Sequence, residues 1–178
     1  ATWAAPAPSR AHGSSASIGA AALLFGLAAV GGAGAALVRR KPRSACEAVG
    51  LLFATQTGST EIFAGYIADA AGVETADIGD YGVEDLTQFD GLIVGCPTWN
   101  TGADEYRSGI AWDDVLDVIK GLDLKGKPVA VFGLGDSEAY SGNFCDGIEE
   151  LHETFKAAGA KLIGYVDASS YNHAESKS

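Results

Sequence analysis

The chain has 178 residues and carries 12 basic and 23 acidic side chains, which gives it a formal net charge of −11. This balance excludes nucleic acid as a partner and favours docking onto basic patches of other proteins. The three cysteines, Cys46, Cys96 and Cys145, have neither metal-ligand nor C-x-x-C spacing, so no metal site or disulfide framework is indicated and a reducing compartment is favoured.

The first 45 residues differ in composition from the rest of the chain. They contain no Asp or Glu and hold five of the 12 basic residues, so the remainder carries all 23 acidic side chains. Residues 1–17 are rich in Ala, Ser and Pro, which predicts a disordered segment that resembles a plastid transit sequence.

Residues 18–38 form an uncharged, apolar run, and a basic linker follows at 39–46. A helix of that length, rising about 1.5 Å per residue, just spans the hydrocarbon core of a bilayer. The basic residues after it would then stay on the cytosolic or stromal side. Two interpretations are open, a removed targeting segment and a retained transmembrane anchor, and we favour the anchor.

The remaining residues, 47–178, are predicted to form one α/β domain. Apolar runs predict buried parallel strands, and longer segments with helical spacing lie between them. This alternation predicts a doubly wound parallel sheet with helices on both faces and right-handed crossovers. The expected strands are 48–54, 73–77, 91–97, 128–134 and 161–166, and the expected helices are 60–71, 111–121 and 143–158.

A hydroxyl-rich loop joins the first strand to the first helix. It reads Thr55-Gln56-Thr57-Gly58-Ser59-Thr60 and contains neither Lys nor Arg. A helix N-terminus offers free N–H groups and the positive end of the helix dipole, so this loop suits a phosphate held by neutral donors. It does not match the P-loop, which requires a Gly-Lys pair. Taken alone, it could equally be an ordinary capped helix start.

Two further strands end in loops that each carry one aromatic residue. The strand at 91–97 continues into Thr98-Trp99-Asn100-Thr101-Gly102, and the strand at 128–134 continues into Gly135-Asp136 and then Tyr140. Ligands of open α/β sheets bind beyond the carboxyl ends of the strands. A phosphate site flanked by two aromatic rings suggests a planar ring held between them. Trp112, which begins the next helical pattern, is more typical of helix-packing core.

The motifs T-Q-T-G-S-T, P-T-W-N-T-G and G-L-G-D-S-E-A-Y-S-G-N-F-C-D resemble, in this order, the three FMN-binding loops of flavodoxins. The similarity runs from about residue 47 to the end of the chain and looks closest to long-chain flavodoxins of eukaryotic algae. It implies the strand order 2-1-3-4-5. It also implies a low-potential one-electron carrier that is not an enzyme.

The resemblance implies a role for each loop residue. Thr55 to Thr60 would hold the FMN phosphate, and Trp99 and Tyr140 would pack on opposite faces of the isoalloxazine. The Asn100–Thr101 peptide would turn its carbonyl toward flavin N5 on one-electron reduction, and the charge of Asp136 would lower the second reduction potential. The full set implied to contact the cofactor is Thr55, Gln56, Thr57, Gly58, Ser59, Thr60, Thr98, Trp99, Asn100, Thr101, Gly102, Gly135, Asp136, Tyr140, Asn143, Cys145 and Asp146, the last three lining the pyrimidine edge together with Asp136.

The implied partners are photosystem I as electron donor and ferredoxin–NADP reductase as acceptor, on the stromal side of the plastid thylakoid, with residues 18–38 as a possible membrane tether. Two other functions stay open: a structural or docking subunit of a photosynthetic membrane complex, and an FMN-dependent quinone reductase. The chain also departs from the long-chain pattern after the last strand, where a further strand and a final helix are expected. One sheet face should therefore be partly uncovered.

Overall fold

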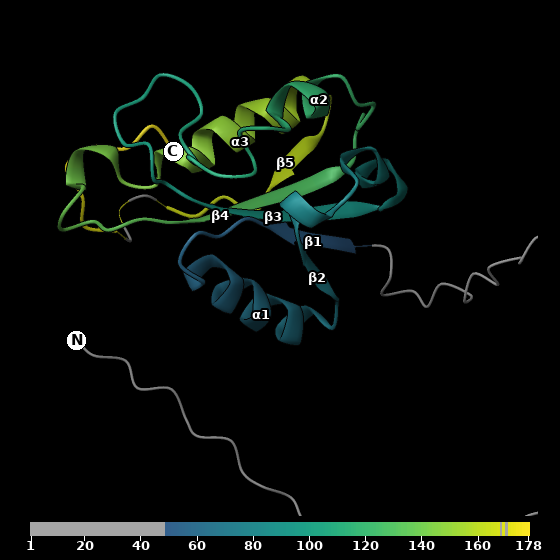
Figure 1. Cartoon of the computed structure of the whole chain (residues 1–178), viewed down its shortest axis with the longest axis horizontal. Coiled ribbons are helices and arrows are strands. Elements are labelled where there is room, and N and C mark those ends of the chain that lie inside the picture. The colour runs from purple at the N-terminus through teal and green to yellow at the C-terminus, as the bar shows by residue number, and fades with distance from the viewer. Residues whose placement is uncertain (1–48, 168, 170) are drawn as a thin grey trace, which may run out of the picture. The chain divides into compact units, whose positions relative to one another are not determined.

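The structure is a computed structural model that describes residues 49–167, 169 and 171–178. Five parallel strands form one sheet in the order β2-β1-β3-β4-β5, which confirms the predicted topology. The strands are β1 Val49–Phe53, β2 Thr75–Asp77, β3 Gly91–Pro97, β4 Pro128–Leu134 and β5 Lys161–Ile163 (Figure 1).

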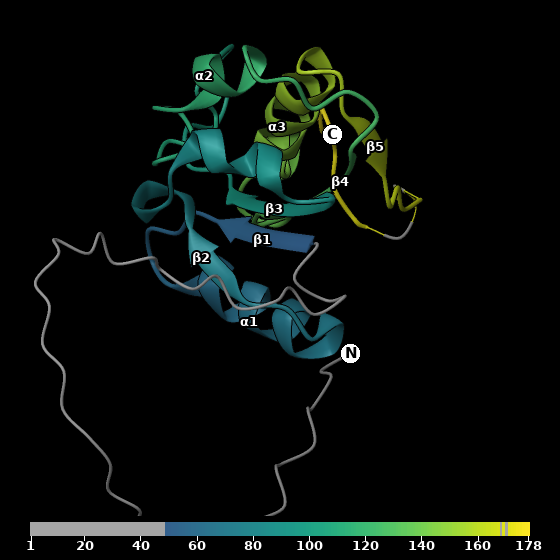
Figure 2. The ribbon, with the colours of Figure 1, turned by 90° about the vertical axis from the view of Figure 1, so that its right-hand side faces the viewer.

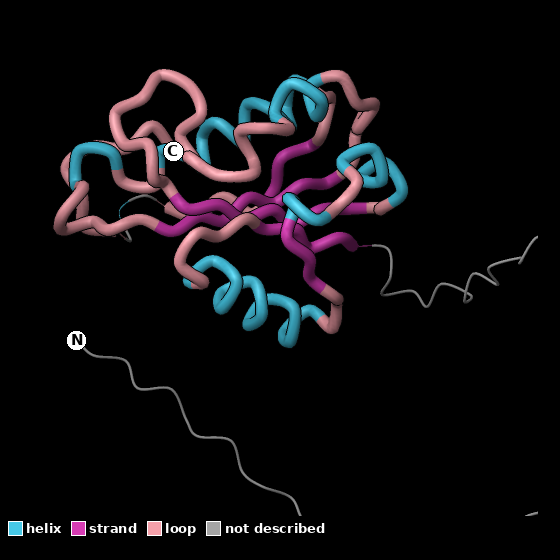
Figure 3. The backbone as a smooth tube through the Cα atoms, viewed as in Figure 1, coloured by secondary structure: helices cyan, strands magenta, loops and turns pink. Residues whose placement is uncertain are grey.

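Helices cover both faces of the sheet. Helix α1 (Ser59–Ala71) lies on one face, whereas α2 (Leu116–Lys120) and α3 (Asp146–Ala157) lie on the other, as Figures 1 and 2 show from two sides. Short 3-10 helices, which the sequence did not indicate, occupy some of the connections visible in Figure 3. These are η1 (Ile78–Asp80), η2 (Val83–Gln88) and η3 (Ser141–Asn143).

Two predicted elements were too long. The helix expected at 111–121 is helical only over α2, because the residues before it form tight turns in which Asp113 N–H donates to the Ile110 carbonyl and Val115 N–H to the Trp112 carbonyl. The strand expected at 161–166 ends at Ile163, since Gly164 takes a left-handed conformation with φ of 83° and turns the chain away from β4.

The third predicted helix, 143–158, also begins later than expected. Cys145 has a left-handed φ of 58°, which a helix interior does not allow, so η3 ends before it and α3 begins after it. The first helix matches its predicted span closely. It ends at Gly72, whose left-handed backbone lets its N–H bond to the Ala68 carbonyl.

Two hydrophobic clusters hold the layers together. The larger one lies between the sheet and the α2/α3 layer, and it is centred on Trp112 and Phe155, which are both fully buried and meet edge to face at 6.2 Å. The smaller one lies under α1 and includes Leu51 and Phe53. Trp112 is therefore core, as predicted.

On the face of the sheet where α1 lies, side chains of β4 and β5 are only partly buried. Leu162 packs against the larger cluster, so its neighbour Ile163 points to the opposite face, where its side chain is 45% exposed. The last residues, 171–178, return to the loop before α3, where the N–H groups of Ala174 and Glu175 both donate to the Ser141 carbonyl.

The predicted segments 1–17, 18–38 and 39–46 lie outside the described residues. Within the described ranges, no helix combines the length and the apolar character that a bilayer span requires.

Candidate functional site

Three loops leave the sheet at the carboxyl ends of the adjacent strands β1, β3 and β4. Backbone hydrogen bonds join the bases of these loops. Ala54 N–H donates to the Gly95 carbonyl at 3.1 Å, and Thr98 N–H donates to the Leu134 carbonyl at 3.2 Å. The three segments singled out in the sequence therefore lie side by side at one edge of the sheet, where ligands of such sheets bind.

The first loop, residues 55–60, ends at the N-terminus of the 13-residue helix α1. The Thr55 hydroxyl accepts from Gly58 N–H at 3.0 Å and closes the turn, and Gly58 has φ of 85°. Gln56, Thr57 and Ser59 are exposed, whereas Thr60 is buried. A Cβ placed on Gly58 would meet no atom within 4 Å, so the loop faces open space. These neutral donors at a helix start have the chemistry that a phosphate needs.

The second loop carries Trp99, which is 48% exposed. Asn100 holds the loop closed, because its backbone N–H donates to the Arg107 carbonyl and its side-chain amide donates to the Tyr106 carbonyl, both at 3.2 Å. Thr101 is half-buried, and Gly102 has a left-handed φ of 79° that the turn requires. Trp99 thus lies next to a residue, Asn100, that is hydrogen-bonded across the loop to Tyr106 and Arg107.

The third loop carries Tyr140, which is 54% exposed. Asp136 shapes this loop, because its carboxylate accepts from the N–H groups of Glu138 and Ala139 at 2.9 Å each, while its carbonyl accepts from Tyr140 N–H. Two large aromatic rings therefore stand exposed on loops at the same sheet edge as the first loop, residues 55–60, which we call the phosphate-type loop. Such surfaces suit a planar aromatic ligand.

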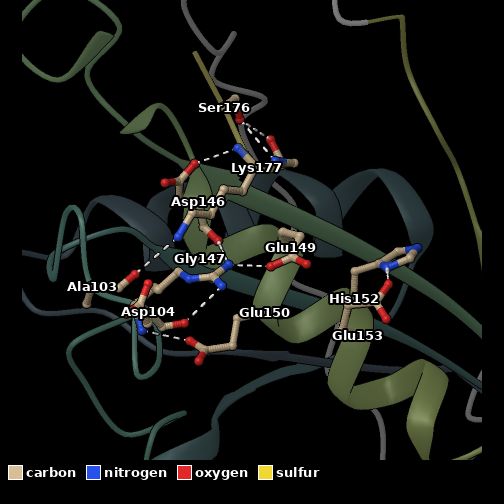
Figure 4. A network of polar contacts seen from close by, with 12 residues as sticks. Ala103, Asp104, Asp146, Gly147, Glu149, Glu150, His152, Glu153, Ser176 and Lys177 are labelled. Carbon is tan, nitrogen blue, oxygen red and sulfur yellow. Dashed lines mark hydrogen bonds and ion pairs between the residues drawn. The ribbon is translucent and has the colours of Figure 1, made fainter. Parts of the chain in front are cut away.

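The residues next to α3 are more enclosed. Cys145 and Asp146 are buried, and burial, reinforced by the charge of Asp146, raises the pKa of the Cys145 thiol to about 11. The Asp146 carboxylate accepts from Lys177 N–H at 2.7 Å and from the Asn143 amide at 3.4 Å. Its charge is thus directed at the C-terminal segment (Figure 4). The predicted contact of Asn143, Cys145 and Asp146 with the edge of the ring stays a prediction.

Close contact between α3 and β3 joins the second and third loops. Gly147 N–H donates to the Thr98 hydroxyl at 2.9 Å, and a Cβ on Gly147 would lie 2.9 Å from the Pro97 carbonyl oxygen. Only a glycine fits this approach. Within the described residues, no group of His, Cys, Asp and Glu side chains could hold a metal ion.

Sequence reasoning missed a polar network behind the second loop. Arg107 donates through its guanidinium to the Glu149 carboxylate and to the Asp104 and Asp146 carbonyls, and Glu150 accepts from two backbone N–H groups of the loop (Figure 4). One signal was available. Arg107 is the sole Lys or Arg between Arg43 and Lys120, and an isolated cation in an acidic chain suggests specific pairing.

A parallel doubly wound sheet, a hydroxyl-rich loop at a helix start and two exposed aromatics are typical of the class of α/β proteins that hold a phosphate-bearing planar cofactor at the carboxyl edge of the sheet. The family comparison agrees. The family model described as Flavodoxin matches residues 51–176, which is more than half of the chain. The chain therefore belongs to the flavodoxin family.

Individual relatives support this assignment. The chain is 41% identical over 133 residues to a flavodoxin of Picosynechococcus sp., with 72% of this chain and 76% of the relative covered. It is 34% identical to Flavodoxin 1 of Escherichia coli over 131 residues, with 72% of each protein covered. The crystal structure of Fusobacterium nucleatum flavodoxin bound to flavin mononucleotide aligns with a TM-score of 0.65 and 28% identity, covering 72% of this chain and 76% of that one.

Flavodoxins are FMN-based electron-transfer proteins and not enzymes. Membership of the family therefore confirms the predicted cofactor and the predicted class of protein. The loop chemistry fits FMN on its own grounds, since neutral donors suit the phosphate and exposed aromatic rings suit the isoalloxazine.

Proposed function

We propose that this chain is a low-potential one-electron carrier of the long-chain, eukaryotic-algal type that takes electrons from photosystem I and delivers them to ferredoxin–NADP reductase. The observation that carries the proposal is the meeting of the three loops at one sheet edge. Thr55 to Thr60 would hold the FMN phosphate, and Trp99 and Tyr140 would flank the ring. FMN supplies the one-electron chemistry when it is bound.

The chain's own residues would then orient and shield the cofactor. The Asn100–Thr101 peptide, which follows Trp99, would contact one edge of the ring, and the exposed carboxylate of Asp136 would add negative charge near it. Negative charge near the ring disfavours its fully reduced anionic form, which would lower the second potential.

The acidic surface supports the choice of partners. An acidic carrier associates with basic surfaces at rates that electrostatic attraction raises and salt lowers. We propose further that residues 18–38 tether the carrier to the thylakoid membrane on the stromal side of the plastid. A tether would raise the effective concentration of the carrier near its donor.

A second candidate function is a docking subunit of a photosynthetic membrane complex. One observation favours it: a hollow of about 800 Å³ lies beside β4, β5 and α3, and Tyr165 and Val166 at its rim are 74% and 71% exposed. Apolar surface of this kind can mark a protein contact. An FMN-dependent quinone reductase is a third candidate, and steady-state NAD(P)H oxidation by the isolated protein would distinguish it from a carrier.

The first experiment is the visible absorption spectrum of the purified full chain, before and during stepwise reduction. A carrier should show a flavin band that is reduced in two separate one-electron steps. A colourless protein that also fails to take up added FMN would contradict the carrier function and support the docking subunit. Reduction by illuminated photosystem I, compared at low and high salt, then tests the proposed donor.

A further inference from the structure

One carboxylate of α3, that of Glu150, binds two backbone N–H groups of the second loop. The Glu150 oxygens accept from Tyr106 N–H and from Arg107 N–H, at 2.7 Å each, across more than 40 residues of sequence. Hydrogen bonds to an ionised carboxylate are shorter and stronger than neutral ones, and 2.7 Å lies in the range of such bonds. The Glu150 side chain thus fixes two consecutive peptides of the loop.

The same two residues are held from the opposite side by Asn100. Their carbonyl groups accept from the Asn100 side chain and backbone, at 3.2 Å each. Glu150 and Asn100 therefore bind one short segment, Tyr106–Arg107, from its two sides. Any movement of that segment is passed to Asn100 and to the neighbouring Trp99.

The backbone of the segment shows that this anchoring is needed. Tyr106 has φ of 57°, in the left-handed region that a bulky side chain disfavours. Such conformations persist where the surroundings over-determine them, and they gather at functional sites. The Glu150 carboxylate supplies that constraint here, because it binds the N–H groups of Tyr106 and of the next residue, and successive N–H groups in a turn can form a concavity that holds an anion.

The Arg107 side chain fastens the same segment a second time. Its guanidinium, 12% exposed, pairs with Glu149 and donates to the Asp146 carbonyl at 3.3 Å, both at the start of α3, and also to the Asp104 carbonyl at 3.0 Å (Figure 4). Both anchors lead to α3, and a helix holds supporting side chains in place better than a loop does.

We propose that Glu150 is a positioning residue that sets the place of Trp99 and the Asn100–Thr101 peptide against the cofactor, and so tunes both cofactor affinity and the stability of its one-electron-reduced form. The inference rests on the proposed FMN function and deepens it, since no contact between Glu150 and the cofactor is required. A pre-organised loop binds more tightly because less order is lost on binding.

The test compares Glu150→Gln and Glu150→Ala with the matched control Glu153→Gln, which lies on the same helix and pairs with Lys156 and His152 instead of the loop. Three quantities are measured: amide exchange at Tyr106 and Arg107 in the apoprotein, the Kd for FMN by ultrafiltration of titrated apoprotein, and the maximal fraction of one-electron-reduced flavin. Urea denaturation of each apoprotein gives its stability.

We expect Glu150→Gln, which keeps one acceptor oxygen, to raise the Kd for FMN roughly tenfold and Glu150→Ala to raise it further. Both should speed amide exchange at Tyr106 and Arg107 and lower the one-electron-reduced fraction, while Glu153→Gln matches the wild type. If Glu150→Ala does not fold, the near-isosteric Glu150→Gln still decides the matter.

A purely structural role would lower the urea midpoint without changing the Kd or the one-electron fraction, and that result would overturn the proposal. Unchanged amide exchange in Glu150→Gln would overturn it as well. If the wild-type chain and Glu153→Gln also fail to bind FMN, the proposed function itself is wrong and the inference fails with it. Binding by those two proteins together with an unaffected Glu150→Gln contradicts the inference alone.

Discussion

The two faces of the sheet differ in how completely their side chains are buried. Under α2 and α3, one cluster extends from Leu52 in β1 to Phe155 in α3, with Trp112 at its centre. Under α1, the cluster is small, and its border residues Ile67 and Phe132 are only partly buried. Because stability scales with buried apolar area and packing, the first face should supply most of the folding free energy.

The three loops of the candidate site are divided between these two faces of the sheet. The second loop leads into α2 and is hydrogen-bonded to α3, and the third loop leads into α3, so both lie on the well-packed face. The phosphate-type loop leads instead into α1, on the face with the smaller cluster. The part of the candidate site that is predicted to flank the ring therefore lies over the larger cluster. The part predicted to hold the phosphate begins at α1, which covers the smaller cluster.

Trp112→Ala should have the largest effect, lowering the free energy of unfolding by about 3–5 kcal/mol. The change removes a fully buried ring from the larger cluster, together with an N–H that donates to the Gly95 carbonyl at 2.8 Å. Urea denaturation measures the loss. Trp112→Phe, which keeps an aromatic ring, should lose only about 1–2 kcal/mol. A loss below about 1 kcal/mol for Trp112→Ala would contradict the view of this face as the main core.

Leu52→Ala and Leu51→Ala compare the two faces directly. These neighbours in β1 are each 1% exposed but point to opposite sides of the sheet. We expect about 3–4 kcal/mol of destabilisation for Leu52→Ala and about 2–3 kcal/mol for Leu51→Ala, because a cavity under the loosely covered face can collapse or fill more easily. Equal losses in denaturant titrations would show that the faces are equally well packed.

Gly147→Ala and Gly65→Ala form a second pair. A Cβ on Gly147 would press against the Pro97 carbonyl, so overpacking should cost about 1–3 kcal/mol. Gly65 lies inside α1, where an added Cβ meets nothing within 4 Å, so alanine should stabilise the protein by about 0.5–1 kcal/mol. Thermal unfolding should therefore shift in opposite directions, and a common direction would refute the comparison.

The buried thiols should produce the smallest effect, visible at alkaline pH. Burial raises the pKa of Cys96, in the larger cluster, well above its ordinary value of 9.0, and raises that of Cys145 to about 11. The folded state thus keeps protons that the unfolded state releases. The stabilising contribution is complete below pH 9 and falls as the pH rises above it. Cys96→Ala should flatten the decline in the free energy of unfolding between pH 9 and 11. An unchanged slope would contradict a contribution from the buried thiol.

Long apolar strands were the easiest elements to predict from the sequence. β3 and β4 match their predicted bounds, and α1 begins one residue early, because the apolar runs are long and are bounded by Gly, Pro and hydroxyl residues. The sheet order followed from the family resemblance. Short elements were less predictable, since α2 and the end of β5 depend on turns whose geometry no periodic pattern encodes.

The candidate site divides in the same way. The three loops that meet at the sheet edge could be singled out because their motifs are contiguous and ordered. The residues that hold these loops in place could not be predicted from the sequence. Glu150 and the Lys177 backbone reach their partners from 30 or more residues away, so only the packing of α3 and the return of residues 171–178 bring them together.

The phosphate-type loop joins the N–H groups at a helix start to several hydroxyls without any Lys or Arg, in a chain whose net charge is −11. A phosphate dianion approaching it therefore meets overall repulsion at long range and gains its binding energy only at contact. Added salt screens that repulsion over a Debye length of about 10 Å at 0.1 M. The association rate of FMN with the apoprotein should accordingly rise with ionic strength, whereas anion sites built from lysine and arginine slow down.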